Sequence, residues 1–149
     1  MRKLVAALFA LSFLAIPNAQ AATPVIRIVD KPHTTFDGAF RSNELAASLL
    51  PNGKLGKLIF GVSSTRSTFV IDASLIDEIE DMADGYIYAG KEDPAGQQTA
   101  RSWLFRLRTI VANNNVVALP YGNPDERLLK SIAPSELKFY SLYAQTQLQ

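Results

Sequence analysis

The sequence predicts an α/β domain with parallel strands, built as a partial (β/α) barrel or as a three-layer domain. Three short apolar runs, at residues 24–30, 67–72 and 116–120, alternate with segments of helical periodicity. Strands that alternate with helices in this way pair in parallel, because each crossover returns the chain to the same end of the sheet. The 149 residues, of which 48% are hydrophobic, suffice for one core, so we expect a single domain.

The first 21 residues are typical of a secretory signal peptide and stand apart from that domain. Arg2 and Lys3 precede an apolar run at residues 4–16, and an A-Q-A cleavage signal ends at Ala21. A membrane anchor fits less well, since a bilayer span needs roughly 18 or more apolar residues. We therefore expect a mature chain of residues 22–149 that is secreted, lies outside the cytoplasmic membrane and has no membrane span.

Charge and composition exclude several classes of function. Cleavage removes Arg2 and Lys3, so 13 of the 15 basic residues remain against 14 acidic ones. A near-neutral chain lacks the clustered positive charge of nucleic-acid-binding proteins, so we expect no nucleic acid as partner. Cysteine is absent, which excludes disulfides and a thiol nucleophile, and His33 is the only imidazole. We expect stability from packing alone, with no structural metal and no cofactor.

The first elements follow from local signals. Residues 24–30 form a β-branched run that predicts a buried strand. Ser42 is placed to cap a helix that stops near residue 51. Residues 55–62 repeat apolar side chains at i, i+3, i+4 and i+7, which predicts a short helix despite two glycines.

The second strand, residues 67–72, is followed at once by a helix with clear start and stop signals. Ser74 and Asp77 have the spacing of a capping box, and Gly85 follows the last turn of an apolar stripe. The next stretch, residues 86–89, is short enough to be a strand or a loop.

The longest helix starts at Asp93, with Pro94 at its first position. Its apolar stripe is expected to pack on the second and third strands and includes Trp103, Leu104 and Leu107. Three basic side chains lie off that stripe and are expected to form a solvated face: Arg101, Arg106 and Arg108.

The C-terminal part begins with the third strand, residues 116–120. Asn123 is expected to cap a further helix with Pro124 at its first position. The tail, about residues 134–149, is more apolar than a disordered end requires. We expect it to fold back over an exposed sheet edge or to dock on a partner, including a second copy of the chain, because unpaired strand edges favour association.

Ligands of parallel α/β folds gather beyond the carboxyl ends of the strands. A glycosidase needs two facing carboxylates roughly 5 to 10 Å apart, so Asp30, Asp72 and Asp125 are weak catalytic candidates at these ends. Two of them have a simpler explanation, because Asp72 and Asp125 each lie where a helix begins and an acid stabilises the helix start.

Two further residues at the strand ends are binding candidates. Tyr121 offers a ledge for a sugar or peptide, and we expect it to contribute to binding rather than to the core. His33 follows Asp30 with D-x-x-H spacing. A deacetylase-type metal needs a second imidazole, which the chain lacks, so we expect no metal site.

Five blocks of the chain follow one another in the order of a known family. They read V-D-K-P-H-T-T-F-D-G-A-F, E-L-A-A-S-L-L-P-N-G-K-L-G-K-L, T-F-V-I-D-A-S-L-I-D-E-I-E-D-M-A-D-G-Y, A-R-S-W-L-F-R-L-R and A-L-P-Y-G-N-P-D. Together they resemble the DUF6049 family, which consists of large envelope proteins of actinobacteria. The resemblance implies an exported protein in a cell-wall setting, with a segment similar to the (β/α) barrels of polysaccharide deacetylases and related glycosidases. It implies no activity, and this chain has fewer strands than a barrel needs.

Two functions are left open. The favoured one is a non-catalytic cell-envelope protein that binds a wall polymer or another envelope protein through the strand-end face. The alternative is a carbohydrate-active hydrolase, deacetylase- or glycosidase-like, or a degenerate descendant of one. Isolated carboxylates and the incomplete metal ligand set favour the first.

Overall fold

The structure, a computed structural model, describes residues 23–62 and 66–148. The signal-peptide segment expected at residues 1–21 lies outside them. The chain forms, in order, β1 (Val25–Ile28), α1 (Glu44–Leu49), α2 (Lys54–Phe60), β2 (Thr68–Asp72), α3 (Ala73–Asp84), β3 (Ile87–Tyr88), β4 (Lys91–Glu92), α4 (Pro94–Val111), β5 (Asn115–Leu119), α5 (Glu126–Ile132) and α6 (Pro134–Gln147). The main sheet is parallel in the order β1-β2-β5, which confirms the α/β class with parallel strands. In the described part of the chain this sheet is open and does not close into a barrel.

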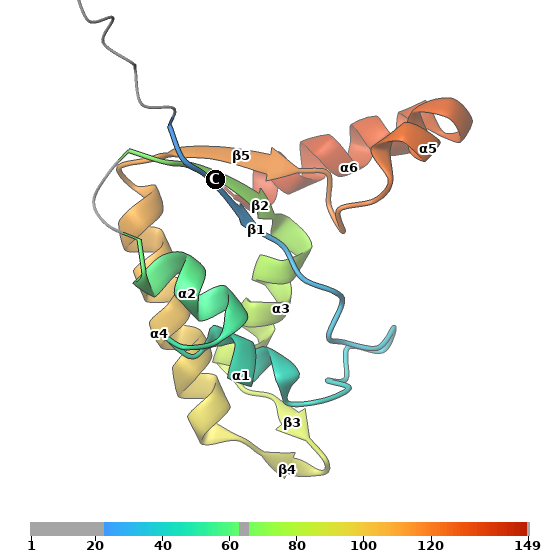
Figure 1. The fold of residues 1–149 in the computed structure, drawn as a ribbon. Coiled ribbons are helices and arrows are strands. Elements are labelled where there is room, and N and C mark those ends of the chain that lie inside the picture. The colour runs from blue at the N-terminus through green and yellow to red at the C-terminus, as the bar shows by residue number, and fades with distance from the viewer. Residues whose placement is uncertain (1–22, 63–65, 149) are drawn as a thin grey trace, which may run out of the picture.

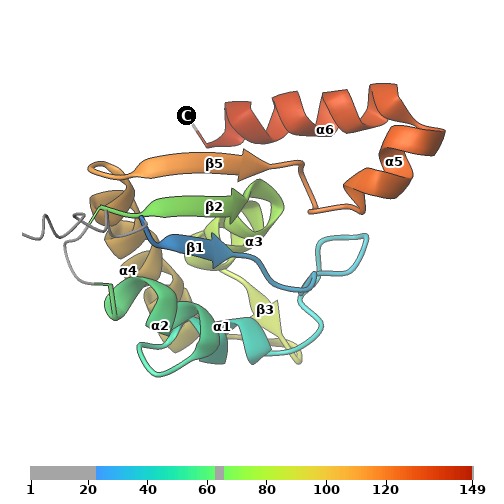
Figure 2. The same ribbon diagram turned by 45° about the horizontal axis from the view of Figure 1, so that its top comes forward.

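The helices cover the sheet unequally. Helices α1 to α4 lie against one face, α6 runs along the β5 edge, and the other face carries no helix of the described residues (Figures 1 and 2). The strand register places Ile28 beside Ile71 on the helix-covered face. Val25 is 64% exposed, and only Ile28 of the four β1 residues is fully buried. The expectation of a buried strand at residues 24–30 is therefore wrong, because β1 is an edge strand of a half-covered sheet.

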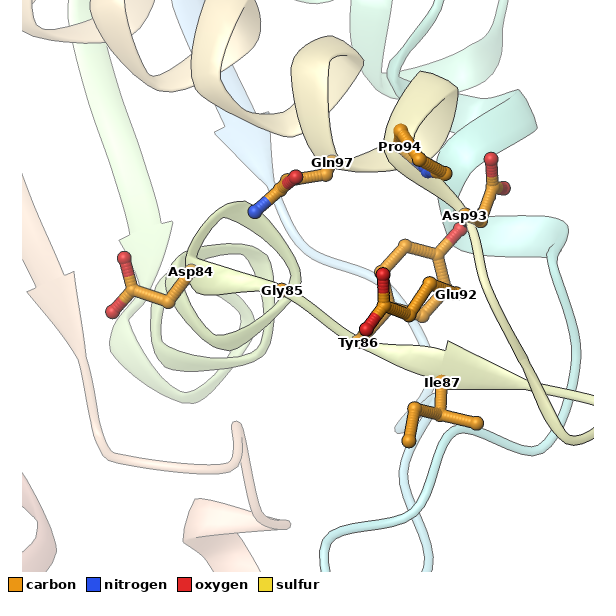
Figure 3. A pocket seen from close by; sticks show the side chains of 8 residues that line it. All are labelled: Asp84, Gly85, Tyr86, Ile87, Glu92, Asp93, Pro94 and Gln97. Atoms are coloured by element: carbon orange, nitrogen blue, oxygen red, sulfur yellow. Dashed lines mark hydrogen bonds between the residues drawn. The ribbon is translucent and has the colours of Figure 1, made fainter.

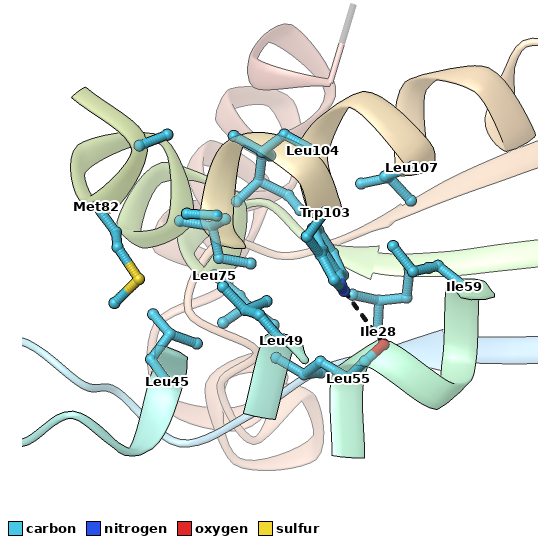
Figure 4. Packing of buried hydrophobic residues seen from close by; sticks show 14 of the residues in the cluster. Ile28, Leu45, Leu49, Leu55, Ile59, Leu75, Met82, Trp103, Leu104 and Leu107 are labelled. Atoms are coloured by element: carbon cyan, nitrogen blue, oxygen red, sulfur yellow. Dashed lines mark hydrogen bonds between the residues drawn. The ribbon is translucent and has the colours of Figure 1, made fainter. Parts of the chain in front are cut away.

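The core lies between the sheet and helices α1 to α4. Trp103, Leu104 and Leu107 are buried there in one apolar cluster with Phe69 and Ile71 of β2 (Figure 4). This confirms the predicted core face of the long helix. The arginines beside this stripe differ in their contacts.

Two exposed arginines of α4 also contact α3. Arg101 Nε donates to the main-chain oxygen of Ala83 at 2.7 Å, and Arg108 pairs with Glu80 at 3.0 Å. Both side chains remain exposed, so the predicted solvated face is confirmed for these two arginines, and it also ties α4 to α3.

A close approach between α1 and α2 explains why glycine stands at position 56, inside a helix. A Cβ atom at Gly56 would stand 1.7 Å from the main-chain oxygen of Leu50, which ends α1. Backbone atoms cannot yield at such a distance, so α2 can lie against α1 only with glycine here. Glycine costs helix propensity in α2, but it permits the contact that places Leu55 in the core.

Two predicted helix caps are wrong, whereas the predicted capping bond of Ser42 forms one residue away from the expected position. α1 begins after Asn43, which makes no side-chain capping bond, but the hydroxyl of Ser42 accepts from the main-chain nitrogen of Glu44 at 3.3 Å. The amide of Asn43 donates to Asp93 at 2.9 Å, and its oxygen lies against the hydroxyl of Tyr86. The start of α1 is thus held both by the local bond of Ser42 and by the tertiary contacts of Asn43.

The two corrected caps are those of α3 and α5, and each is an aspartate. Asp72 caps α3 by accepting from the main-chain nitrogen of Ser74, so the predicted capping box does not form. Asp125 caps α5 by accepting from Leu128 N at 2.9 Å, whereas Asn123 adopts a left-handed backbone with φ 43°. The cap at Asp93 with Pro94 in the first turn of α4 is as predicted.

The C-terminal segment packs against the domain, one of the two arrangements that its sequence left open. It is the helix α6, which lies along β5 and contacts α3 (Figure 2). The main-chain nitrogen of Tyr121 donates to the oxygen of Tyr140 at 3.1 Å, and Leu148 packs against the core cluster. The ambiguous stretch at residues 86–89 contains β3, which pairs with β4 in a small hairpin.

Candidate functional site

A cavity of about 320 Å³ opens at the carboxyl ends of the three parallel strands. Residues after β1, at the β2–α3 junction and after β5 line it together, as expected for ligand sites of this fold class. Its lining is rich in acids. The side chains that matter below are Asp30, Asp72, Asp77, Glu78, Asp81 and Tyr121.

Asp30 stands at the β1 end of the cavity and is held by positive charge. Its Oδ1 accepts from Lys54 Nζ at 2.7 Å and from the main-chain nitrogen of Lys31 at 2.9 Å. Burial opposes ionisation of Asp30, but these hydrogen bonds and the charges of Lys54 and His33 outweigh it and lower the pKa of its carboxyl below 3.8. Asp30 is therefore a carboxylate at neutral pH.

His33 lies behind Asp30 rather than in the cavity lining. Its side chain is 3% exposed, and Nε2 stands 3.6 Å from Asp30 Oδ2 without a hydrogen-bond partner among the described residues. The main-chain nitrogen of His33 donates to both carboxylate oxygens of Glu78, at 3.0 and 3.1 Å. The loop after β1 is thus tied to α3, and the imidazole does not line the cavity.

Asp72 joins two strand ends. Its Oδ1 accepts from the nitrogen and hydroxyl of Ser74, at 3.1 and 2.9 Å, and from the nitrogen of Gly122, at 3.1 Å. The side chain is buried, and one oxygen therefore both caps α3 and fixes the turn after β5. The helix-start interpretation of Asp72 is confirmed, and the same contacts place it at the cavity floor.

Tyr121 lines the cavity with a hydroxyl that is already engaged. The hydroxyl donates to Asp77 Oδ2 at 2.8 Å, and the ring meets Tyr143 edge-on, with centroids 4.9 Å apart. Burial first, and then the hydrogen bond to Asp77, raise the pKa of Tyr121. Burial likewise raises the pKa of Asp77; the bond from Tyr121 opposes this rise, and the nearby acids of α3 and Asp72 add to it. Tyr121 is a structural member of this edge as well as a binding candidate.

Sequence reasoning missed three acids that α3 presents to the cavity. Asp77, Glu78 and Asp81 occupy the second and third turns after β2, and all three line it. A signal was present, because a helix that directly follows a strand starts at the strand-end face. Asp77 was assigned to a capping box instead, which removed it from the candidates.

Asp125 does not belong to this group. It caps α5 on the surface and is absent from the cavity lining. Of the three catalytic candidates, the structure brings together only Asp30 and Asp72. Within residues 23–62 and 66–148, no group of three or more acidic or histidine side chains is arranged to hold a metal ion.

A second hollow, of about 360 Å³, lies beside the β3–β4 hairpin (Figure 3). Its best-organised group is structural. The hydroxyl of Tyr86 donates to Asp93 Oδ2 at 2.7 Å, and Asp93 Oδ1 accepts from the nitrogen of Gly96 at 3.0 Å. Burial and the contact with Asp93 raise the pKa of Tyr86, so this hydroxyl stays protonated and serves the packing of α4.

The chain matches no protein-family model, no curated protein and no solved structure with which it was compared. Among its described helices, none combines the length and the apolar character needed to cross a bilayer. Function therefore has to be inferred from the residues of the strand-end cavity and from the sequence.

Proposed function

We propose that this chain is an exported cell-envelope protein that binds a hydroxyl-rich segment of a wall polymer in the strand-end cavity, without transforming it. The observation that carries this proposal is the lining of that cavity. Carboxylates and a tyrosine from three separate segments converge on one concave space of about 320 Å³. Such convergence of polar groups on a concavity is typical of small-ligand sites.

The chemistry of the lining favours a carbohydrate over a flat protein surface. Ionised carboxylates only accept hydrogen bonds, and sugar hydroxyl groups donate them. Asp81 is exposed and has no hydrogen bond or ion pair among the described residues, so its acceptors are free for a ligand. Another envelope protein is the second possible partner, and its binding would need an area larger than this cavity.

The hydrogen-bond network favours binding over catalysis. Asp72 accepts three hydrogen bonds within the chain through one oxygen, and Glu78 accepts from the main chain of His33 and from Thr34. Asp72 thus caps α3, and Glu78 fixes the loop after β1, so both carboxylates hold the site in shape. Hydrolysis instead needs a carboxyl group free to exchange a proton with the substrate.

A hydrolase is the second candidate, and one observation favours it. Asp30 and Asp77 line the same cavity, and their surroundings move their pKa values in opposite directions, down for Asp30 and up for Asp77. Divergent pKa values of two carboxyl groups are the pattern of an acid–base pair. In that case Asp77 would donate the proton, and Asp30 would remain ionised.

The setting of the proposal comes from the sequence. Arg2, Lys3 and the apolar run that ends before Ala21 support export, and the resemblance to DUF6049 proteins supports the cell wall. The polymer would therefore be met outside the cytoplasmic membrane.

Co-sedimentation of the purified chain with isolated cell wall tests the binding proposal. Asp81→Ala should weaken binding about tenfold, since charge-assisted hydrogen bonds to the ligand are lost. Asp84→Ala is the matched control: it removes an exposed acid from the same helix, outside this cavity, and should bind as the wild type does. Equal binding by Asp81→Ala and the wild type would exclude the cavity as the site.

Incubation with wall polysaccharide separates the two candidates. A binding protein releases neither sugar nor acetate. Release by the wild type, and its loss in Asp77→Asn, would establish the hydrolase, because a carboxamide cannot donate the proton.

A further inference from the structure

Another concave site, distinct from the strand-end cavity and from the hollow beside the hairpin, lies at the amino-terminal end of the strands. This hollow of about 200 Å³ is formed where β2 begins and α4 ends. Its polar lining is basic and neutral, with Arg66, Arg106, Thr109 and Asn113, and it contains no acid. The charge is therefore opposite to that of the strand-end cavity.

Neither guanidinium of this hollow is neutralised within the described chain. Arg66 and Arg106 take part in none of its ion pairs or side-chain hydrogen bonds, whereas Arg101 and Arg108 of the same helix are both engaged. Arg106 is half-buried, so its charge is partly withdrawn from water. Two unpaired guanidinium groups on one concave surface repel each other unless an anion lies between them.

The frame that carries the two arginines is braced. The side chain of Asn114 accepts from the nitrogen of Ser67 at 2.7 Å and donates to the oxygen of Ile110 at 2.8 Å. Ser67 follows Arg66 directly, and Ile110 lies one turn after Arg106. The start of β2 and the end of α4 are thus held together, and the two arginines have fixed points of attachment.

We propose that Arg66 and Arg106, assisted by the amide of Asn113, bind a phosphate group. Each guanidinium offers a planar fork of donors, and one fork already satisfies the two oxygens of a carboxylate. A phosphate has enough acceptor oxygens in different directions for two forks from different elements. The site is separate from the strand-end cavity and does not depend on the proposed function.

The phosphate can belong to a polymer or to a lipid headgroup, and the probes distinguish these sources. Binding of inorganic phosphate, followed by NMR of the main-chain amides, measures the shared chemistry. Poly(glycerol phosphate) in solution and vesicles that contain phosphatidylglycerol then report the source. We expect binding to inorganic phosphate and to at least one of the two larger probes.

Arg66→Gln and Arg106→Gln should each weaken phosphate binding about tenfold, because each removes charge-assisted hydrogen bonds. Arg106→Lys should retain part of the affinity, since it keeps the charge and loses the fork. Arg27→Gln is the control, because it removes an exposed arginine from the open face of the sheet. Asp81→Ala should leave phosphate binding unchanged, which keeps this test independent of the wall-polymer test.

Two results would overturn the proposal. One is equal loss of phosphate binding in Arg27→Gln, which would reduce the effect to net charge. The other is undiminished binding in Arg66→Gln. Arg66 is exposed and unpaired among the described residues, so Arg66→Gln should keep the fold. Its phosphate binding therefore tests the proposal even if the Arg106 variants unfold.

Discussion

The indole nitrogen of Trp103 donates a hydrogen bond to the main-chain oxygen of Leu55 at 3.2 Å, inside the apolar core (Figure 4). This bond joins α4 to the first turn of α2, two helices separated along the chain by β2, α3 and the hairpin. Both residues are fully buried, so no water replaces the bond. The contact therefore fixes how the long helix sits against the crossover between β1 and β2.

Two substitutions at Trp103 separate its volume from its hydrogen bond. Trp103→Ala should lower the free energy of unfolding by about 3 to 5 kcal/mol, the usual cost of truncating a large core side chain. Trp103→Phe keeps most of the apolar volume and should cost about 1 kcal/mol more than the lost volume alone, because the indole no longer donates its hydrogen bond to Leu55. Urea unfolding of both variants measures the difference. A loss of only a few tenths in Trp103→Ala would contradict the buried position.

The core was predictable because periodicity reports it directly. The stripe of α4 with Trp103 and Leu107, and the parallel pairing of β2 with β5, follow from apolar spacing and element order. The uncovered face of β1 was not predictable in this way. A β-branched run looks the same in a buried strand and in an edge strand, because the number of layers depends on elements elsewhere.

The candidate site was half predictable. Asp30 and Asp72 were placed correctly because strand ends meet at one edge of a parallel sheet. The sequence does not show that Asp125 lies outside the cavity. The turn before Asp125 follows a path set by Asn123 in a left-handed conformation, which a sequence pattern does not reveal. Contacts across 44 or more residues, such as those of Asp77 with Tyr121, leave no local signal.

Gly96 and Tyr86 offer a test of close packing at the start of α4. A Cβ atom at Gly96 would stand 2.2 Å from the hydroxyl oxygen of Tyr86. Gly96→Ala should therefore destabilise the chain by about 1 to 3 kcal/mol, although alanine is the better helix former. Removing the hydroxyl in Gly96→Ala/Tyr86→Phe should recover part of this loss in thermal unfolding. A double variant less stable than Gly96→Ala would contradict the clash.

The pH dependence of stability should reveal the ion pair of Asp30. Its folded pKa lies below the ordinary value of 3.8, so its contribution is present above that value and is lost as the pH falls through the folded pKa. Asp30→Asn should cost up to about 1 kcal/mol at pH 7, because the partner Lys54 is exposed, and nothing in strong acid. Urea unfolding at pH 7 and pH 2 measures this. Lys54→Met should show the same convergence, and a pH-independent cost would refute the ion pair.

Export is tested by the N-terminus that the expressed chain carries after secretion. The A-Q-A signal predicts that a chain expressed in an actinobacterial host is cleaved after Ala21 and begins at Ala22. N-terminal sequencing of the extracellular fraction checks this. An intact Met1 on protein that stays in the cytosol would contradict the proposed setting.

Tyr121 and Asp77 should behave as a coupled pair. Tyr121→Phe removes the donor to a half-buried carboxylate and should cost about 1 to 2 kcal/mol at pH 7. Tyr121→Ala should cost more, since the contact with Tyr143 is lost as well. The expectation that Tyr121 serves binding alone therefore needs revision: loss of wall binding in Tyr121→Ala has to be judged beside its stability, whereas Asp81→Ala is free of this complication.

The sign of the pH effect at Asp77 is opposite to that at Asp30. The folded pKa of Asp77 lies above 3.8, so stability linked to this group is full below that value and falls as the pH rises through the folded pKa. Asp77→Asn removes the buried charge. Its free energy of unfolding should therefore rise relative to that of the wild type as the pH increases from 3 to 7. In Tyr121→Phe the charge has lost its donor, so the same gain should be larger. A double-mutant cycle at the two pH values measures the coupling, and additive effects at pH 7 would show that the 2.8 Å hydrogen bond does not hold the two side chains together.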